Sequence, residues 1–282
     1  MNNNIDEMHF LVLHVGEAHC MKDWNYKNVC SPFTRIYYVT KGHAQIKLPD
    51  KNQDLYPDHL YIIPAFTPHS YICNEEFDHY YIHIYNEAEH DILDELLLPT
   101  EIEADHIILE AIRRLLNLCP NMGLTQYEPS SYDYDTARWH CLIKNKQRSL
   151  AARVESRAII YLLLSCFMRL AVPKHHAKDE RIQNVLEYIH SNIYKKISMK
   201  DLADISCMSE DYLIRLFKKE LFMTPVNYII KKKMEKAQLK LVTGNAPIKE
   251  ISYQLGFESQ EYFTRVFKKM TGLTPLAYRK SH

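Results

Sequence analysis

The sequence contains few glycines and no cysteine motif. Only six glycines occur in 282 residues, which leaves little material for a glycine-rich loop that would cradle a phosphate. The seven cysteines are odd in number, widely separated and without a Cys-x-x-Cys pair: Cys20, Cys30, Cys73, Cys119, Cys141, Cys166 and Cys207. This pattern argues against a disulfide framework and a zinc site. It favours buried thiols in a reducing compartment.

The sequence also shows no pattern typical of a targeting segment or a membrane span. The first ten residues, MNNNIDEMHF, have no basic region followed by an apolar core, so we expect no secretory signal. The most apolar run, residues 158–168 (AIIYLLLSCFM), is too short to cross a bilayer and is flanked by Arg157 and Arg169. We therefore expect a cytoplasmic protein with no membrane partner, in which this run forms a buried or interface helix.

Net charge is zero, but the charges are divided unevenly. Residues 178–282 contain 19 Lys+Arg and 12 Asp+Glu, which is +7; the first 177 residues contain the other 16 and 23, which is −7. Such asymmetry suggests that the basic part meets a polyanion. A solvated charged face is the alternative interpretation.

Hydrophobic periodicity divides the chain into an all-β part and a helical part. Residues 31–85 contain aromatic and β-branched runs of period two separated by turn residues, which predicts a barrel or sandwich. Helical patterns follow at 91–118 and 149–170. A polar run after Pro173 reads as a linker. We expect an α+β protein with domains at 1–172 and 181–282, joined by a linker at 173–180.

The most informative feature is a segment that occurs twice. Residues 209–228 (SEDYLIRLFKKELFMTPVNY) and 259–278 (SQEYFTRVFKKMTGLTPLAY) are identical at nine of twenty positions. In each copy a serine stands at a helix N-cap position, followed by acidic residues that suit the helix dipole. Apolar residues recur at i, i+3 and i+4 and predict a buried face: Leu213, Leu216 and Phe217 in the first copy, Phe263, Val266 and Phe267 in the second.

A shorter helical segment precedes each copy. Residues 199–206 (MKDLADIS) and 248–256 (IKEISYQLG) are followed by a tight turn and then by the capped helix. This order is typical of a helix-turn-helix unit. Residues 226–242 have the length of one connecting helix. Such a helix could hold two recognition helices about one turn of B-DNA apart, roughly 34 Å, so that both enter successive major grooves.

These motifs carry a family resemblance. Residues 181–282 resemble the DNA-binding domain of the AraC/XylS family of transcription regulators, above all in residues 248–279 (IKEISYQLGFESQEYFTRVFKKMTGLTPLAYR). The first copy departs from the family at Phe222, where glycine is usual and where the second copy has Gly272. The connecting helix has Lys233 where arginine is usual. The resemblance implies a transcription activator that binds double-stranded DNA, with RNA polymerase as a further partner.

By this resemblance, the base-reading positions lie on the outer faces of the two capped helices: Asp211, Ile214 and Arg215, then Gln260, Glu261, Thr264 and Arg265. Arginine can bond guanine bidentately, glutamine can read adenine, and an acidic side chain can accept from cytosine N4. For Asp211 and Glu261, a favourable interaction with the helix dipole is the alternative. The paired lysines, Lys218-Lys219 and Lys268-Lys269, are expected to contact phosphate.

The first domain resembles the cupin-like effector domain of sugar-responsive members of this family. The markers are RIYYVTKG (35–42), PDHLYIIPAFTPHSY (57–71) and FDHYYIHIY (77–85). The resemblance implies a ligand inside a β-barrel, contacted by Lys41, Tyr71, His79 and Tyr81. Aromatic faces with a few polar groups suit a sugar or a sugar derivative. The resemblance also implies homodimerisation through the helices at 91–118 and 149–170; capping of the barrel is the alternative.

A metal site is not expected. Thirteen of the 15 histidines precede Lys178, but KGHAQIKLPD lacks the His-x-His and nearby Glu of a metal-binding cupin. His79 and His83 would share a strand face about 13 Å apart, too far for one metal ion. We expect no cofactor and no enzyme activity. The alternatives are a metal-dependent cupin enzyme fused to a DNA-binding module, and a ligand-independent regulator whose barrel only dimerises.

Overall fold

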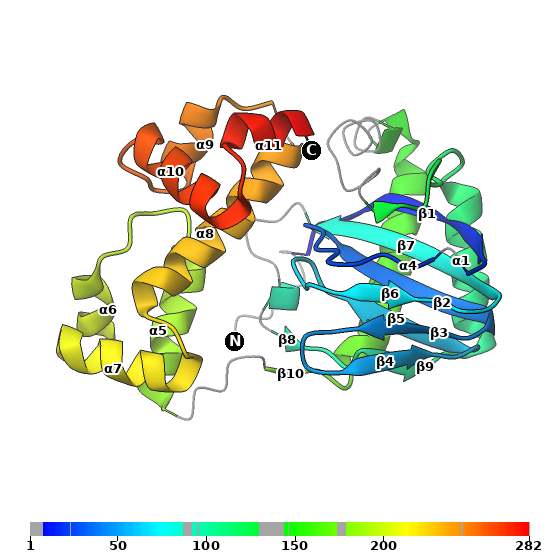
Figure 1. Ribbon diagram of the computed structural model, residues 1–282, viewed down its shortest axis with the longest axis horizontal. Coiled ribbons are helices and arrows are strands. Elements are labelled where there is room, and N and C mark those ends of the chain that lie inside the picture. Colours follow the sequence, from blue (N-terminus) through cyan, green and yellow to red (C-terminus); the bar gives the residue numbers. More distant parts are fainter. Residues whose placement is uncertain are drawn as a thin grey trace. The chain divides into compact units, whose positions relative to one another are not determined.

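The computed structural model describes residues 8–22, 24–86, 92–94, 96–129, 144–145, 147–173, 179–243 and 245–281. The chain divides into two compact units, Met1–Val172 and Pro173–His282. The first is rich in β-sheet and the second is helical (Figure 1), which confirms the predicted α+β class. Most of the predicted linker, residues 174–178, lies outside the described residues.

Two larger sheets make up most of the β-rich unit, and a further two-stranded sheet pairs β8 (Leu96–Leu97) with β10 (Val172–Pro173). A five-stranded sheet has the order β1 (Phe10–Cys20), β7 (Phe77–Asn86), β2 (Thr34–Gly42), β5 (His59–Ile63) and β9 (Glu101–Glu103). A three-stranded sheet has the order β4 (Asn52–Leu55), β3 (Ala44–Lys47) and β6 (Ser70–Ile72). The described pairings within these sheets are antiparallel.

Alternation along the strands gives the five-stranded sheet two different buried faces. On β2, Ile36 and Tyr38 belong to one hydrophobic cluster, whereas Tyr37 and Val39 belong to another, as expected for side chains with a period of two. The second cluster also contains Ile46 of β3 and Tyr71 of β6. Its members therefore form an interior shared by the two sheets.

Helices α1 (His106–Leu118) and α4 (Leu150–Met168) cover the other face of the five-stranded sheet (Figure 1). Asp105 and Ser149 cap their N-termini. The Arg114 guanidinium donates two hydrogen bonds to the Glu155 carboxylate, at 2.6 and 2.9 Å, and so joins the helices. The apolar run at 158–168 lies on α4 and buries one face, as predicted. No helix in the described ranges is both long and apolar enough to span a membrane.

The helix predicted from residue 91 is wrong over its first part. Residues Ile92–Asp94 form a 3-10 turn, Leu96–Leu97 form the short strand β8, and β9 pairs with β5; α1 begins only at His106. Pro99 lies in this stretch, and a proline cannot donate the backbone hydrogen bond that a helix interior needs. Pairing with the edge of β5 then decides the local structure, which a helical period alone cannot reveal.

The second unit contains seven described helices. They are α5 (Glu180–Ser191), α6 (Met199–Ser206), α7 (Glu210–Leu221), α8 (Pro225–Thr243), α9 (Ile248–Gln254), α10 (Gln260–Thr271) and α11 (Pro275–Ser281). The pairs α6–α7 and α9–α10 are the two predicted helix-turn-helix units, and α8 is the predicted connecting helix. Ser198 and Asp201 form a capping box at the start of α6, which fixes where the first unit begins.

Both long helices of the repeat end in a left-handed residue. Phe222 has φ 58° and Gly272 has φ 81°, and the backbone N–H of each donates to a lysine carbonyl, of Lys218 and Lys268 respectively. Glycine adopts this conformation without strain, whereas a residue with a Cβ does so at a cost of roughly 1–2 kcal/mol. The Phe222 side chain is 90% exposed, so burial does not offset this cost.

Replacing Phe222 by glycine should therefore stabilise the helical unit. We expect Phe222→Gly to raise the free energy of unfolding by about 1 kcal/mol, the strain removed less the extra backbone entropy of glycine. The measurement is urea unfolding of the full-length protein followed by far-ultraviolet circular dichroism.

Gly272→Ala is the matched control, because an added Cβ there would meet nothing within 4 Å. Its only cost is conformational, so we expect a loss of about 1 kcal/mol. An unchanged or lowered midpoint for Phe222→Gly would contradict the strain assigned to Phe222.

Candidate nucleic-acid interface and ligand-binding interior

The two repeated helices, α7 and α10, have the same orientation relative to their cores. Ser209 and Ser259 accept hydrogen bonds from the backbone N–H of the third helical residue, at 3.4 and 3.1 Å. Leu213 and Phe217 are completely buried in the first unit. Phe263 and Phe267 are completely buried in the second, and Leu216 and Val266 are partly buried, as predicted. This packing leaves the opposite face of each helix in contact with solvent.

Every predicted DNA-contacting residue lies on these outer faces. Six are exposed and three are half-buried: Asp211, Arg215, Lys218, Glu261, Arg265 and Lys268, then Ile214, Gln260 and Thr264. Within the described ranges, no hydrogen bond or ion pair engages the side chains of Arg215, Lys218 or Lys268. The structure thus brings the predicted residues of each copy together on one surface. Their contact with bases stays a prediction.

The distribution of charge is the same along both outer faces. Acidic residues occupy the first turn, and a lysine pair occupies the last turn: Lys218-Lys219 in α7 and Lys268-Lys269 in α10. Acidic side chains interact favourably with the positive end of the helix dipole. The lysines are exposed cations that suit phosphate oxygens.

Two tyrosines were missed at the sequence level. Tyr212 and Tyr262 occupy the same position in the two copies, and each is 42% exposed. The Arg265 guanidinium carbon lies 5.4 Å from the centre of the Tyr262 ring, and that of Arg181 lies 5.7 Å from the Tyr212 ring. Cation–π contact of this kind orients an arginine. The signal in the sequence is that a tyrosine occupies the same position of both repeated helices, although that position is outside the predicted buried face.

The interior of the β-rich unit is lined with aromatic residues. Trp24 lies at the centre, with its ring centroid 4.3 Å from that of Tyr71, 5.1 Å from that of Phe77 and 5.2 Å from that of His79. The hydroxyl groups of Tyr37 and Tyr71 are 2.7 Å apart, and His69 Nε2 lies 2.8 Å from the Tyr71 oxygen. This interior combines flat apolar faces with a few polar atoms, the composition typical of a small-molecule site.

Three of the four predicted effector residues lie together in this interior. Tyr71, His79 and Tyr81 are almost completely buried and belong to inward-facing positions of β6 and β7. Lys41 lies elsewhere: its ammonium group is exposed and pairs with the Glu76 carboxylate at 2.8 Å. The role of Lys41 in ligand binding stays a prediction, and the structure does not bring it together with the other three.

Burial keeps the interior histidines neutral. Loss of solvation lowers the pKa of His79 to about 3 and that of His69 to about 4. His79 Nδ1 is buried and has no hydrogen-bond partner among the described residues. A buried polar atom of this kind is uncommon in native proteins. It can donate to, or accept from, a ligand hydroxyl.

Tyr81 is held by close packing and one backbone contact. Its oxygen accepts a hydrogen bond from the Leu124 backbone N–H at 2.8 Å, and burial raises its pKa to about 12. A Cβ at Gly16 would lie 2.2 Å from this oxygen. A larger residue at position 16 would therefore displace the Tyr81 hydroxyl.

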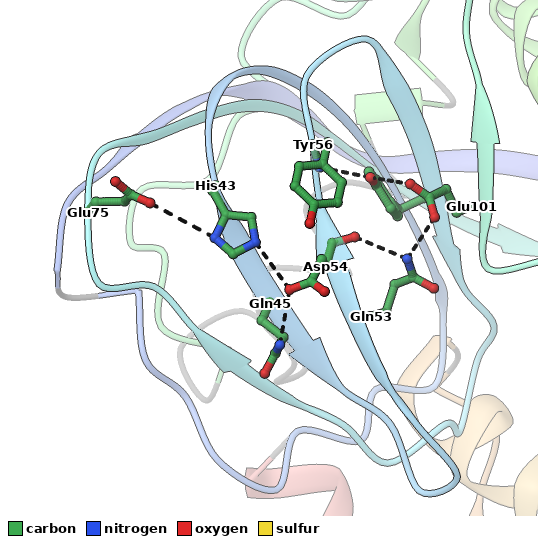
Figure 2. A network of polar contacts seen from close by, with 8 residues as sticks. His43, Gln45, Gln53, Asp54, Tyr56, Glu75 and Glu101 are labelled. Carbon is green, nitrogen blue, oxygen red and sulfur yellow. Dashed lines mark hydrogen bonds and ion pairs between the residues drawn. The ribbon is translucent and has the colours of Figure 1, made fainter.

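The polar residues around His43 do not resemble a metal centre. Figure 2 shows this network, in which His43 Nε2 lies 3.1 Å from the Asp54 carboxylate and Nδ1 lies 3.9 Å from that of Glu75. The Glu101 carboxylate accepts hydrogen bonds from Gln53 and from the Tyr61 hydroxyl, at 2.8 and 2.7 Å, and so links the two sheets. Across the described ranges, no three His, Cys, Asp or Glu residues are arranged to hold a metal ion.

Comparison with protein families agrees with this division. Residues 12–131 match the family described as "AraC-like ligand binding domain", and residues 202–281 match "Helix-turn-helix domain". The first match contains the aromatic interior, and the second contains both repeated helices.

Three curated relatives illustrate how far the likeness extends. The uncharacterized HTH-type transcriptional regulator YdeC of Bacillus subtilis is 34% identical over 36% of this chain and 35% of its own length. The protein named "Probable transcriptional regulator LumQ" of Photobacterium leiognathi is 27% identical over 58% of this chain and 70% of its own. The arabinose operon regulatory protein of Escherichia coli is 30% identical over 37% and 36%.

The first and third alignments span only about a third of those relatives. The two family matches occupy separate parts of the chain, in the order ligand-binding domain and then helix-turn-helix domain. Together with the duplicated, serine-capped helices and the β-rich unit that precedes them, these matches show that the chain belongs to the AraC family of transcription regulators.

Proposed function

We propose that this protein is a transcription activator that binds two adjacent DNA half-sites through α7 and α10. Binding is controlled by a small molecule, a sugar or a sugar derivative, in the β-rich unit. The observation that carries the proposal is the duplicated scaffold: the same positions are buried and apolar in both copies, whereas Ile214 and Thr264 differ in polarity on the outer faces. One scaffold with two outer surfaces suits two different half-sites.

The interior of the β-rich unit supports an uncharged, hydroxyl-rich effector. Its histidines are neutral near pH 7 because burial lowers their pKa values, so they bond hydroxyl groups without adding charge. The Trp24 and Tyr71 rings offer flat faces for sugar C–H groups. His79 Nδ1, which lacks a described partner, is the polar atom that a ligand would satisfy. Ligand binding shifts activity only through different affinities for two states of the protein.

An exposed apolar stripe on α4 supports homodimerisation. Leu150 is 73% exposed, Val154 is 60% exposed, and Leu162 is 37% exposed; Ala158 is exposed between them. These residues recur every four positions and so form one ridge on the helix surface. The opposite face of α4 is buried against the sheet. We propose that the ridge packs against α4 of a second copy, and that the DNA-bound dimer contacts RNA polymerase.

The primary test is selection of binding sites from random double-stranded DNA with the full-length protein. Enrichment of a motif with two unlike parts about one helical turn apart is the expected result. Recovery of no enriched sequence would contradict the proposed function. Binding to the selected site should weaken steeply with salt, because lysine–phosphate contacts release counterions.

Base reading by Arg265 can be separated from phosphate contact. Arg265→Ala should lose about 1–3 kcal/mol of discrimination at one base pair, since a bidentate contact to guanine disappears. Lys269→Ala, the control on the same helix, should weaken binding to all sequences alike. The measurement is titration of the selected site and its single-base variants. An Arg265→Ala variant that weakened every sequence equally would exclude base reading.

A sugar that binds the interior should raise the melting temperature of the full-length protein. The stabilisation is about 2.7 kcal/mol at one hundred times the dissociation constant. His79→Phe should weaken that binding by about 1 kcal/mol, because the ring packing is kept and one hydrogen bond is lost. His43→Phe, outside the interior, is the control. The measurement is a thermal-shift titration followed by calorimetry.

The same titration should be flat in pH between 5.5 and 8. His79 and His69 have pKa values of about 3 and about 4, so neither gains a proton in this range. An ordinary histidine would be largely charged at pH 5.5. A sugar affinity that fell as the pH dropped through 6.5 would show that the contacting histidine is not one of these two.

Val154→Glu should convert the dimer to a monomer, because it places a charge in the centre of the apolar ridge. Arg153→Glu adds the same side chain at the neighbouring exposed position, off the ridge, and should leave the dimer intact. Light scattering after size exclusion gives the mass of each variant. If the two variants have the same mass, the ridge does not form the dimer interface.

A further inference from the structure

The two helix-turn-helix units meet at a tight backbone contact. Gly256, in the turn between α9 and α10, has φ 68°. A Cβ at this position would lie 2.5 Å from the Lys195 carbonyl carbon and 2.7 Å from the Lys196 nitrogen, both in the segment between α5 and α6. Only glycine allows the turn of the second unit to lie directly against the backbone of the first.

Lys233 lies at the same junction. It is near the middle of α8 and only 5% exposed. Its Nζ donates hydrogen bonds to the carbonyl oxygens of Lys195 and Leu255, both at 2.7 Å. The first carbonyl lies in the segment that leads into α6 of the first helix-turn-helix unit, and the second lies at the end of α9 in the second helix-turn-helix unit. One side chain therefore ties the connecting helix to both units.

Burial shows that this contact is more than a surface bridge. Desolvation lowers the pKa of Lys233 to about 8, so the group is still mainly charged near neutral pH. Its Nζ also lies 5.5 Å from the centre of the Phe257 ring. A buried ammonium group is costly unless its hydrogen bonds are satisfied, and the carbonyls of Lys195 and Leu255 satisfy those of Lys233 while the group stays buried.

One exposed contact and one half-buried contact lie beside Lys233 and Gly256. The Lys196 ammonium pairs with the Glu258 carboxylate at 2.5 Å and so joins the two units again. Tyr194 packs against the hydrophobic clusters of both units, and Lys240 of α8 lies 5.1 Å from its ring centre. We call Tyr194, Lys195, Lys233, Gly256 and Glu258 the junction. The helix α8 is therefore braced at its middle as well as at its ends.

We propose that Lys233 is a positioning residue that sets the half-site spacing the protein accepts. The inference rests on the proposed function. One base pair moves a half-site by about 3.4 Å and rotates it by a tenth of a turn. Two reading helices that are braced against each other cannot follow such a change, whereas units joined by an unbraced helix can adjust to it.

The test uses the full-length protein and the selected DNA site, with one base pair inserted or deleted between its two parts. The wild type should bind the site with the selected spacing about tenfold or more tightly than the altered sites, because a wrong spacing costs about one good base contact. Lys233→Met keeps the packing but removes both hydrogen bonds. Lys233→Met should reduce this affinity ratio to within about threefold, which is less than half of the wild-type difference in binding free energy.

Three further variants make the result specific. Lys231→Met, an exposed lysine on the same helix, should keep the wild-type preference. Lys233→Arg, which retains the donors, should keep more of the preference than Lys233→Met does. Gly256→Ala forces the backbones apart at the same place without touching Lys233, and it should relax the spacing in the same direction as Lys233→Met.

The outcomes separate this inference from the proposed function. If the wild type binds no sequence specifically, the proposed function fails. A wild type that binds specifically, with a folded Lys233→Met variant that keeps the full spacing preference, overturns the role of Lys233. Unfolding of both Lys233→Met and Gly256→Ala, seen by circular dichroism, would assign the junction to stability alone and would also overturn the proposal.

Discussion

The helical unit depends on one constraint: neither helix-turn-helix is large enough to bury a core alone. Chains of about 60 residues hide only about 60% of their unfolded surface, and shorter ones hide less. Helix α8 resolves this by serving both cores. Tyr228 and Ile229 complete the first, and Met234 and Leu241 complete the second. Because one helix contributes to both cores, α7 and α10 are held at a defined separation.

In the β-rich unit, the corresponding constraint is that buried polar groups need hydrogen-bond partners. A hydroxyl or a ring nitrogen inside a core must find a partner, and Tyr37, Tyr71 and His69 meet this by bonding one another. His79 departs from the rule at Nδ1, in the middle of the aromatic interior. This unpartnered atom, more than the aromatic residues themselves, supports the proposal that the interior binds a ligand.

The sequence predicted the helical unit well because its signals are local. Serine caps, a period of 3.6 and the repeat placed α6, α7, α9 and α10 and their outward residues. Strand β1 was missed and residues 96–103 were predicted as helix, since both depend on pairing with strands distant in sequence. The family resemblance placed His79 in the interior, and its side chain is buried there. The ion pair of Lys41, the close approach at Gly256 and the two bonds of Lys233 need three-dimensional contacts that no sequence pattern encodes.

The two units are not interchangeable, and this gives the protein a direction. Their buried positions coincide, but Ile214 stands opposite Thr264 on the outer faces, and Phe222 opposite Gly272 at the helix ends. An isoleucine can contact only apolar groups such as the thymine methyl, whereas a threonine also forms hydrogen bonds. Under the proposed function, exchanging the two helix-turn-helix units on a DNA site would therefore mismatch both half-sites. With α8 fixing their separation, the order of the units in the chain becomes the order of the half-sites on DNA, so the proposed operator has a polarity.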